Sequence, residues 1–137
     1  MWSLGQKNVR SVVVMSTMVS SILGRTNAEI LAWESYVLGS PLATGYHQSG
    51  WRRVIEEAFG HPTHYLVVHG QDGVLQGVLP LVLLASRGFG RFLVSLPFVN
   101  YGGVVASSAE AHRFLEARAI EQARELNVDH IELRHQA

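Results

Sequence analysis

The sequence predicts an α+β fold in which helices flank a mixed β-sheet, and three observations lead to this class. Helical segments alternate with short apolar runs in the order strand, helix, helix, three strands, helix, strand. Two of the apolar runs are joined by a glycine-containing turn, which is typical of an antiparallel hairpin. A long helix precedes the final apolar run, so the last strand is expected to return parallel to an earlier one.

The first elements are predicted from apolar spacing and from a capping signal. Residues 1–25 form an N-terminal extension, and the apolar run 9–23 within it is a candidate first strand. Thr26 and Glu29 have the spacing of a capping box, and apolar residues at helical spacing follow until a glycine and a proline end the helix. A second helix with an apolar stripe is expected over 49–59.

Three strands are predicted in the middle of the chain. The run 63–69 and the run 74–86 are separated by a turn whose Asp72-Gly73 pair favours positive φ, so they form a hairpin. Pro80 removes one amide from the second strand and indicates a bulge or an edge there. A third strand is expected over 92–96.

The last elements follow a loop at 97–105. Ser107 and Glu110 have the spacing of another capping box, which opens a long helix. Asn127 is expected to end this helix in the left-handed conformation, and the run 128–134 is expected to form the closing strand.

Composition narrows the class of protein. The chain has 137 residues, 11 basic and 11 acidic, no cysteine, and only 16% charged residues. Balanced charge gives no general nucleic-acid surface, and the lack of cysteine excludes disulfides and thiolate-bound zinc. The apolar runs predict neither a membrane span nor a secretion signal, so the sequence predicts a cytoplasmic protein. The low charged fraction indicates an extra apolar face that is buried against something else.

A series of short blocks along the chain resembles FemAB-type proteins, and the similarity extends over 28–134. In chain order, the blocks are 43–47 (ATGYH), 50–56 (GWRRVIE), 58–61 (AFGH), 65–67 (YLV), 77–82 (GVLPLV), 96–103 (LPFVNYGG) and 131–134 (IELR). The branch that they resemble most is the FemAB-related group associated with exosortase/PEP-CTERM exopolysaccharide systems.

The resemblance implies a fold and an activity. FemAB-type proteins carry two GNAT-like (acyl-CoA N-acyltransferase) domains in tandem, and residues 26–137 are similar to the first domain without its final elements. The implied function is the N-terminal part of an N-acyltransferase or aminoacyltransferase, whose acceptor is a peptidoglycan precursor or an exopolysaccharide-linked group. Acyl-CoA or aminoacyl-tRNA is the implied donor, and a glycan, peptide or small molecule the acceptor.

Two alternatives to part of a longer enzyme stay open at this stage. One is a non-catalytic GNAT-like module that binds or dimerises. The other is a free-standing small acetyltransferase, which is disfavoured because the sequence has no recognisable acyl-CoA loop. The expected partner is accordingly a missing C-terminal GNAT-like domain, or a second copy that pairs through an exposed sheet edge.

The glycine-containing loop holds the main candidate site residues. A GNAT-like fold places a carbonyl-polarising backbone N–H at the strand predicted over 92–96. Tyr101 follows in the loop and is the candidate catalytic residue, because its phenol can donate a proton. Asn100, Gly102 and Gly103 are candidates for substrate binding. The alternative interpretation is that this loop binds no substrate and is only a tight connection between the strand and the helix, whose glycines permit positive φ.

Four further residues are candidates for substrate binding. Arg87 and Arg91 flank a short glycine-containing turn and have the donor geometry to bind phosphate, although an exposed hairpin tip explains them equally. His47 and Trp51 lie in the blocks that resemble FemAB-type proteins, and capping or core packing is the alternative for both.

Two other sets of residues are given structural interpretations. The seven histidines lack the spacing of a metal site, so no metal is expected. Arg52 and Arg53 precede Glu56 and Glu57 by four residues, which predicts ion pairs on the helix surface.

Overall fold

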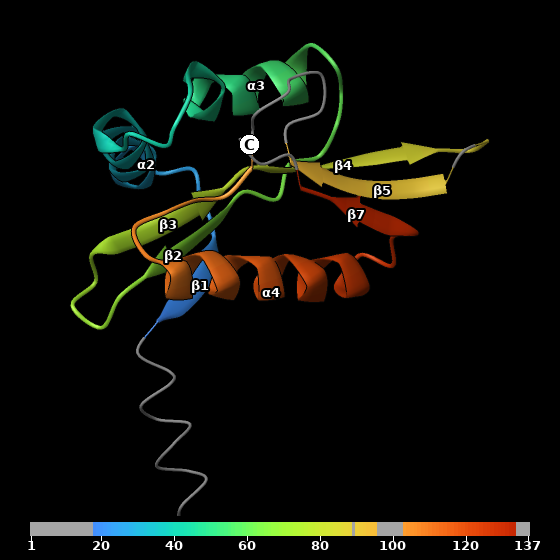
Figure 1. The fold of residues 1–137 in the computed structure, drawn as a ribbon. Helices are drawn as coiled ribbons and strands as arrows, with labels where there is room; N and C mark the ends of the chain where they lie inside the picture. The colour runs from blue at the N-terminus through green and yellow to red at the C-terminus, as the bar shows by residue number, and fades with distance from the viewer. Residues whose placement is uncertain (1–17, 89, 96–102, 134–137) are drawn as a thin grey trace, which may run out of the picture.

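The computed structural model describes residues 18–88, 90–95 and 103–133 (Figure 1). The strands are β1 (Val19–Ile22), β2 (Leu66–His69), β3 (Leu75–Leu79), β4 (Leu81–Ser86), β5 (Gly90–Ser95), β6 (Val105–Ala106) and β7 (His130–Glu132). The helices are α2 (Asn27–Gly39), the 3-10 turn η1 (Gly45–His47), α3 (Gly50–Glu57) and α4 (Ala109–Glu125). This order follows the predicted succession with two differences: the strand expected over 74–86 is divided into β3 and β4, and the short strand β6 was not predicted. Several of the bounds are also shorter than expected.

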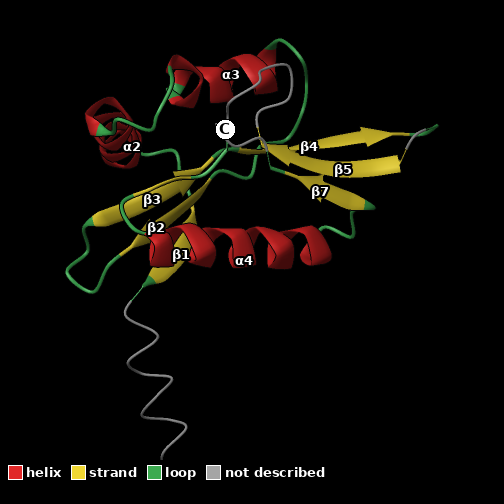
Figure 2. Ribbon diagram, in the orientation of Figure 1, coloured by secondary structure: helices red, strands yellow, loops and turns green. Residues whose placement is uncertain are grey.

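The strands form two sheets, and the chain passes directly from the first to the second between β3 and β4. One sheet has the order β1-β2-β3-β6 and is antiparallel throughout. The other has the order β4-β5-β7, with β4 antiparallel to β5 and β7 parallel to β5. Helices α2 and α3 lie on one side of the sheets and α4 lies on the other (Figure 2). The arrangement confirms an α+β fold with a mixed sheet flanked by helices.

The strand predicted over 74–86 is two strands, and Pro80 separates them. Proline has no amide to donate to a ladder, so pairing is interrupted where it stands. On one side of this break β3 pairs with β2 and β6, and on the other β4 pairs with β5. The prediction of a single strand was therefore wrong, while the irregularity expected at the proline is confirmed.

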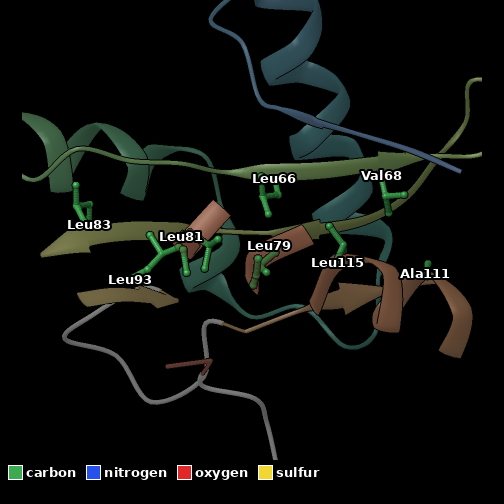
Figure 3. Close-up of a cluster of buried hydrophobic side chains, with 10 residues drawn as sticks. Leu66, Val68, Leu79, Leu81, Leu83, Leu93, Ala111 and Leu115 are labelled. Carbon is green, nitrogen blue, oxygen red and sulfur yellow. The ribbon is translucent and has the colours of Figure 1, made fainter. Parts of the chain in front are cut away.

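Two clusters of buried side chains hold the layers together. The larger cluster joins both sheets to α4, and Figure 3 shows its leucines extending from Leu83 and Leu93 to Leu79 and Leu115. Gly77 lets α4 approach β3 closely, because an added Cβ would lie 2.8 Å from Leu115 Cδ1 and 3.2 Å from the Val105 carbonyl oxygen. The smaller cluster packs Trp33 and Val37 of α2 on the other side of the β1–β2–β3–β6 sheet.

The helix ends are fixed by short-range hydrogen bonds. Thr26 caps α2 through the Glu29 amide, as predicted, but the Glu29 carboxylate turns back to the Gly24 amide. Helix α4 is capped by Ser108 and not by Ser107, so the N-cap lies one residue later than predicted and accepts the Ala111 amide. The reciprocal pair predicted between Ser107 and Glu110 was therefore wrong.

The remaining helix ends give one confirmation and one correction. Asn127 has φ 54°, which confirms the left-handed end expected for α4. The second helix ends at Glu57 and not at residue 59, and Phe59, the last apolar residue of the predicted stripe, is 50% exposed. None of the helices in the described part of the chain is long and apolar enough to cross a membrane.

Candidate functional site

The candidate site lies where the chain passes from β5 of one sheet to β6 of the other. The chain leaves β5 at Ser95, paired with β4, and re-enters a sheet at Val105, paired with Val78 of β3. Strand β7 pairs with β5 and therefore belongs to the same sheet as β5, since Leu93 lies opposite Ile131. The predicted site residues Asn100, Tyr101 and Gly102 fall between these strands and lie outside the described residues. Gly103, the last of the predicted site residues in that loop, is described and buried.

His47 fastens the end of this loop to η1. Its Nδ1 accepts a hydrogen bond from the Thr44 amide at 3.1 Å, so Nδ1 carries no proton. Nε2 is therefore the protonated nitrogen, and it donates to the Gly103 carbonyl oxygen at 2.8 Å. The imidazole is 3% exposed, and this burial lowers the pKa of His47 and favours the neutral ring. The structure thus brings His47 and Gly103 together through a hydrogen bond from the imidazole to the backbone carbonyl.

Aromatic rings pack around the η1 segment that contains His47. The Trp33 indole donates to the His47 carbonyl oxygen at 2.6 Å and stacks on the Tyr65 ring at 5.0 Å between centroids. The Tyr65 hydroxyl is buried and has no hydrogen-bond partner among the described residues, and burial raises the pKa of that phenol. Trp51 is half-buried and contacts Tyr46, with 5.7 Å between ring centroids. Trp33 of α2 and Trp51 of α3 therefore both contact the η1 segment.

Arg52 corrects one of the predicted ion pairs. The Arg53–Glu57 pair exists at 2.5 Å, as predicted, but Arg52 is only 7% exposed and does not pair with Glu56. Its guanidinium instead donates to the carbonyl oxygens of Leu23 at 2.8 Å and Gly24 at 2.7 Å. Arg52 therefore ties α3 to the end of β1, a long-range contact that helical spacing does not indicate.

Arg25 supplies the partner that Glu56 was expected to find on its own helix. Its guanidinium forms two bonds to the Glu56 carboxylate, at 2.9 and 2.6 Å. This pair lowers the pKa of Glu56 and leaves the carboxylate ionised.

A groove extends from the C-terminal part of α2 to the first turn of α4, and its two hollows have volumes of about 410 and 430 Å³. Both hollows are lined by Leu42, Ala106 and Ser107. His112 and Arg113 line the second hollow on the α4 side. Helix N-termini carry partial positive charge, so this groove has the chemistry to hold an anionic group.

A pair of hydroxyl groups fixes one wall of the groove. The Tyr36 hydroxyl donates to the Gln76 carbonyl oxygen at 3.0 Å. Since a phenol has one proton, the Ser107 hydroxyl is the donor in its 2.7 Å bond to Tyr36. Helix α2, strand β3 and the start of α4 are thereby joined at one point. Three distant segments meet here, and no local pattern in the sequence indicated it.

Arg87 and Arg91 lie away from this groove. Arg87 is exposed in the turn between β4 and β5, and Figure 1 shows that this hairpin points away from the start of α4. The Arg91 guanidinium donates to the Leu126 carbonyl oxygen at 2.9 Å, which places it at the opposite end of α4. The structure therefore does not bring this pair to the groove or to Gly103. In the described ranges, no group of acidic and histidine side chains is arranged to hold a metal ion.

Comparison with known proteins identifies the fold. No family model matches the sequence, and no curated protein matches it. The chain is similar to the crystal structure of a GNAT family acetyltransferase from Staphylococcus aureus, with a TM-score of 0.58 and 13% identity over 88% of each chain. This likeness shows that the chain has the GNAT fold, while the resemblance to FemAB-type proteins stays a prediction.

Proposed function

We propose that this chain of GNAT fold forms the donor-binding part of an N-acyltransferase, which moves an acyl group from an activated donor to an amine. The observation that carries the proposal is the division of the sheets between β5 and β6, directly before the grooved N-terminus of α4. Where a strand diverges from the strand beside it, its backbone N–H groups lose their hydrogen-bond partners in the sheet. Such N–H groups can then donate to the carbonyl oxygen of a bound acyl group and polarise it. The fold that the chain shares with an acetyltransferase supports the same reaction class.

The groove at α4 is our candidate for the anionic portion of the donor. Its positive helix end and the Arg113 guanidinium are suited to phosphate oxygens. Glu110 stands in the first turn of the same helix and is exposed, so it opposes an anion only weakly through solvent. Acyl-CoA is the donor that this arrangement favours, because its pyrophosphate and its thioester occupy separate ends of one molecule.

The finer assignment follows the resemblance in the sequence. We propose an amine of a cell-envelope component, a peptidoglycan precursor or an exopolysaccharide-linked group, as acceptor. Tyr101 is our candidate for the proton transfer, with Asn100, Gly102 and Gly103 beside it. Aminoacyl-tRNA is the alternative donor, and a non-catalytic module for binding or dimerisation is the alternative to an enzyme.

Calorimetric titration of the intact protein with acetyl-CoA, and separately with aminoacyl-tRNA, tests the proposal. We expect acetyl-CoA to bind and Arg113→Ala to weaken it about fivefold, since an exposed charge-assisted contact contributes roughly 1 kcal/mol. Arg124→Ala is the matched control, because Arg124 is also exposed but lies in the last turn of α4. Binding of aminoacyl-tRNA alone would reassign the donor.

Turnover tests the catalytic assignment separately from binding. Acyl transfer to an amine is measured with the wild-type protein and with Tyr101→Phe, which removes only the phenolic oxygen. We expect the donor affinity of this variant to stay unchanged while its turnover falls. Failure of the wild-type protein to bind either donor would contradict the enzyme and favour the non-catalytic module.

A further inference from the structure

The two hollows of the groove differ in the charge of their walls. The hollow of about 430 Å³, which we call the α4 hollow, is lined in part by the Arg113 guanidinium and the first turn of α4. The hollow of about 410 Å³, which we call the α2 hollow, lies between the C-terminal part of α2 and Ser107. None of the described residues that line the α2 hollow carries a charged side chain. Hydroxyl groups therefore decide which polar groups the α2 hollow accommodates.

Both hydroxyl protons of the Tyr36–Ser107 pair are donated within the chain. A carbonyl oxygen can only accept, so the 3.0 Å bond between Tyr36 and the Gln76 carbonyl uses the phenol proton. The Ser107 proton is then used in the 2.7 Å bond to the Tyr36 oxygen. Burial raises the pKa of the Tyr36 phenol, so the phenol keeps its proton at neutral pH. The pair therefore offers a ligand lone pairs on two oxygens and no proton.

These lone pairs favour one class of ligand group over another. A ligand N–H or O–H can donate to them, whereas phosphate and carboxylate oxygens are acceptors and would be repelled. An anion in the α2 hollow would also lose water without gaining a positive side chain, which is unfavourable. Ser35 and Ser40 line the same hollow, but a hydroxyl group both donates and accepts and carries no charge, so these two residues do not reverse the preference.

The next residue along the chain, Ser108, has the opposite hydrogen-bonding character. Its side-chain oxygen accepts the Ala111 amide at 3.1 Å as the N-cap of α4. This bond uses a lone pair and not the hydroxyl proton, so Ser108 can donate to a ligand in the α4 hollow, which it lines. Two consecutive serines thus differ in what they offer: Ser107 only accepts, and Ser108 can donate.

We propose that Tyr36 determines the specificity of the groove. By accepting the Ser107 proton it excludes anions from the α2 hollow, which instead holds an uncharged group that donates hydrogen bonds, such as an amide or a hydroxyl. The anionic group of the same ligand is confined to the α4 hollow, so a molecule bound along the groove has one direction. That this molecule is the acyl donor rests on the proposed function, whereas the character of the α2 hollow does not.

Titration of the protein with inorganic phosphate, followed by backbone amide chemical shifts, tests the exclusion of anions. In the wild type we expect phosphate to shift the Ala109 amide of the α4 hollow and not the Gly39 amide of the α2 hollow. Tyr36→Phe frees the Ser107 proton, and the Gln76 carbonyl still accepts the Ser107 amide at 2.8 Å, so the variant should fold. We expect phosphate to bind beside Gly39 in this variant about tenfold more tightly than in the wild type, because the freed hydroxyl can donate to a charged acceptor.

Two further variants separate the hydroxyl proton from the shape of the hollow. Tyr36→Phe combined with Ser107→Ala lacks the freed hydroxyl and should exclude phosphate again. Tyr46→Phe is the matched control, because this exposed phenol belongs to η1 and lines neither hollow. The proposal is overturned by a phosphate shift at Gly39 in the wild type, by no gain in Tyr36→Phe, or by a gain that survives the loss of the Ser107 hydroxyl.

Acetamide and N,N-dimethylacetamide test the preference for hydrogen-bond donors. Both probes are uncharged, but only acetamide has N–H groups. We expect acetamide to bind the wild type beside Gly39 about fivefold more tightly than its dimethyl derivative, and Ser107→Ala, which removes one acceptor oxygen, to reduce this ratio. Equal affinities for the two probes in the wild type would overturn the preference. These measurements use neither an acyl donor nor turnover, so failure of acetyl-CoA to bind would contradict the proposed function and leave this result standing.

Discussion

Replacement of His47 by glutamine and by asparagine separates its two hydrogen bonds. The glutamine amide nitrogen occupies the position of Nε2 and can still donate to the Gly103 carbonyl oxygen. The asparagine oxygen occupies the position of Nδ1 and can still accept the Thr44 amide. Each variant therefore keeps one contact and loses the other, while both remove the aromatic ring.

The sizes of the two effects follow from burial. The Gly103 contact is buried, and its loss leaves a carbonyl without a donor, which costs about 1–3 kcal/mol. The Thr44 contact is only partly buried, so water can replace the lost acceptor and the cost is about 1 kcal/mol or less. We expect His47→Asn to lower the free energy of unfolding by about 1–2 kcal/mol more than His47→Gln.

Urea unfolding measures the stabilities, and amide hydrogen exchange at β6 measures the local effect. His47→Asn should speed exchange in Val105 and Ala106, while His47→Gln should leave it close to wild type. Equal loss of stability in the two variants, or faster exchange in the glutamine variant, would refute the assignment of Nε2 as the donor that holds Gly103.

Three further predictions concern the described core. Burial lowers the pKa of both His47 and His64, so the unfolded chain binds protons more readily. The free energy of unfolding should therefore fall as the pH drops below about 6.5, and His47→Gln should reduce this slope in urea titrations; an unchanged slope would exclude His47 as a contributor. Arg52→Met removes the donor to two carbonyl groups and should lower the unfolding free energy by about 2–4 kcal/mol in urea, whereas a loss under about 0.5 kcal/mol would contradict its buried role. Gly77→Ala places a methyl group 2.8 Å from a leucine of α4 and should lower the thermal midpoint, while Gly50→Ala, with nothing within 4 Å, should not; similar midpoints for the two would contradict the close approach of α4.

Local signals in the sequence predicted the order of the elements. The Thr26 cap and the left-handed Asn127 depend on a few neighbouring residues, so they are legible without tertiary contacts. The split of one strand at Pro80 was half predicted: the proline indicates an interruption, but only the pairing partners show that the interruption divides two sheets. The N-cap of α4 was predicted one residue too early because Ser107 and Ser108 both have a capping side chain, and the Ser107 hydroxyl is bonded to Tyr36.

The candidate site was less legible because its contacts join distant segments. His47 reaches Gly103, and Arg52 reaches the end of β1, through hydrogen bonds to backbone oxygens, which every residue type carries. A pattern in side chains therefore gives no indication of them. The same spacing that correctly predicted the Arg53–Glu57 pair suggested a surface pair for Arg52 as well, and burial overrode it.

The pairing of β6 with β3 also has a consequence for the route of folding. Val78 and Val105 become partners only after the chain has travelled out along β4 and back along β5. Closure of that long loop has an entropic cost, which falls if the local β4–β5 hairpin forms first and brings its two ends together. The hairpin that carries Arg87 at its tip is then a folding guide for the groove at α4, and substitutions that weaken it should slow refolding while leaving the finished groove unchanged.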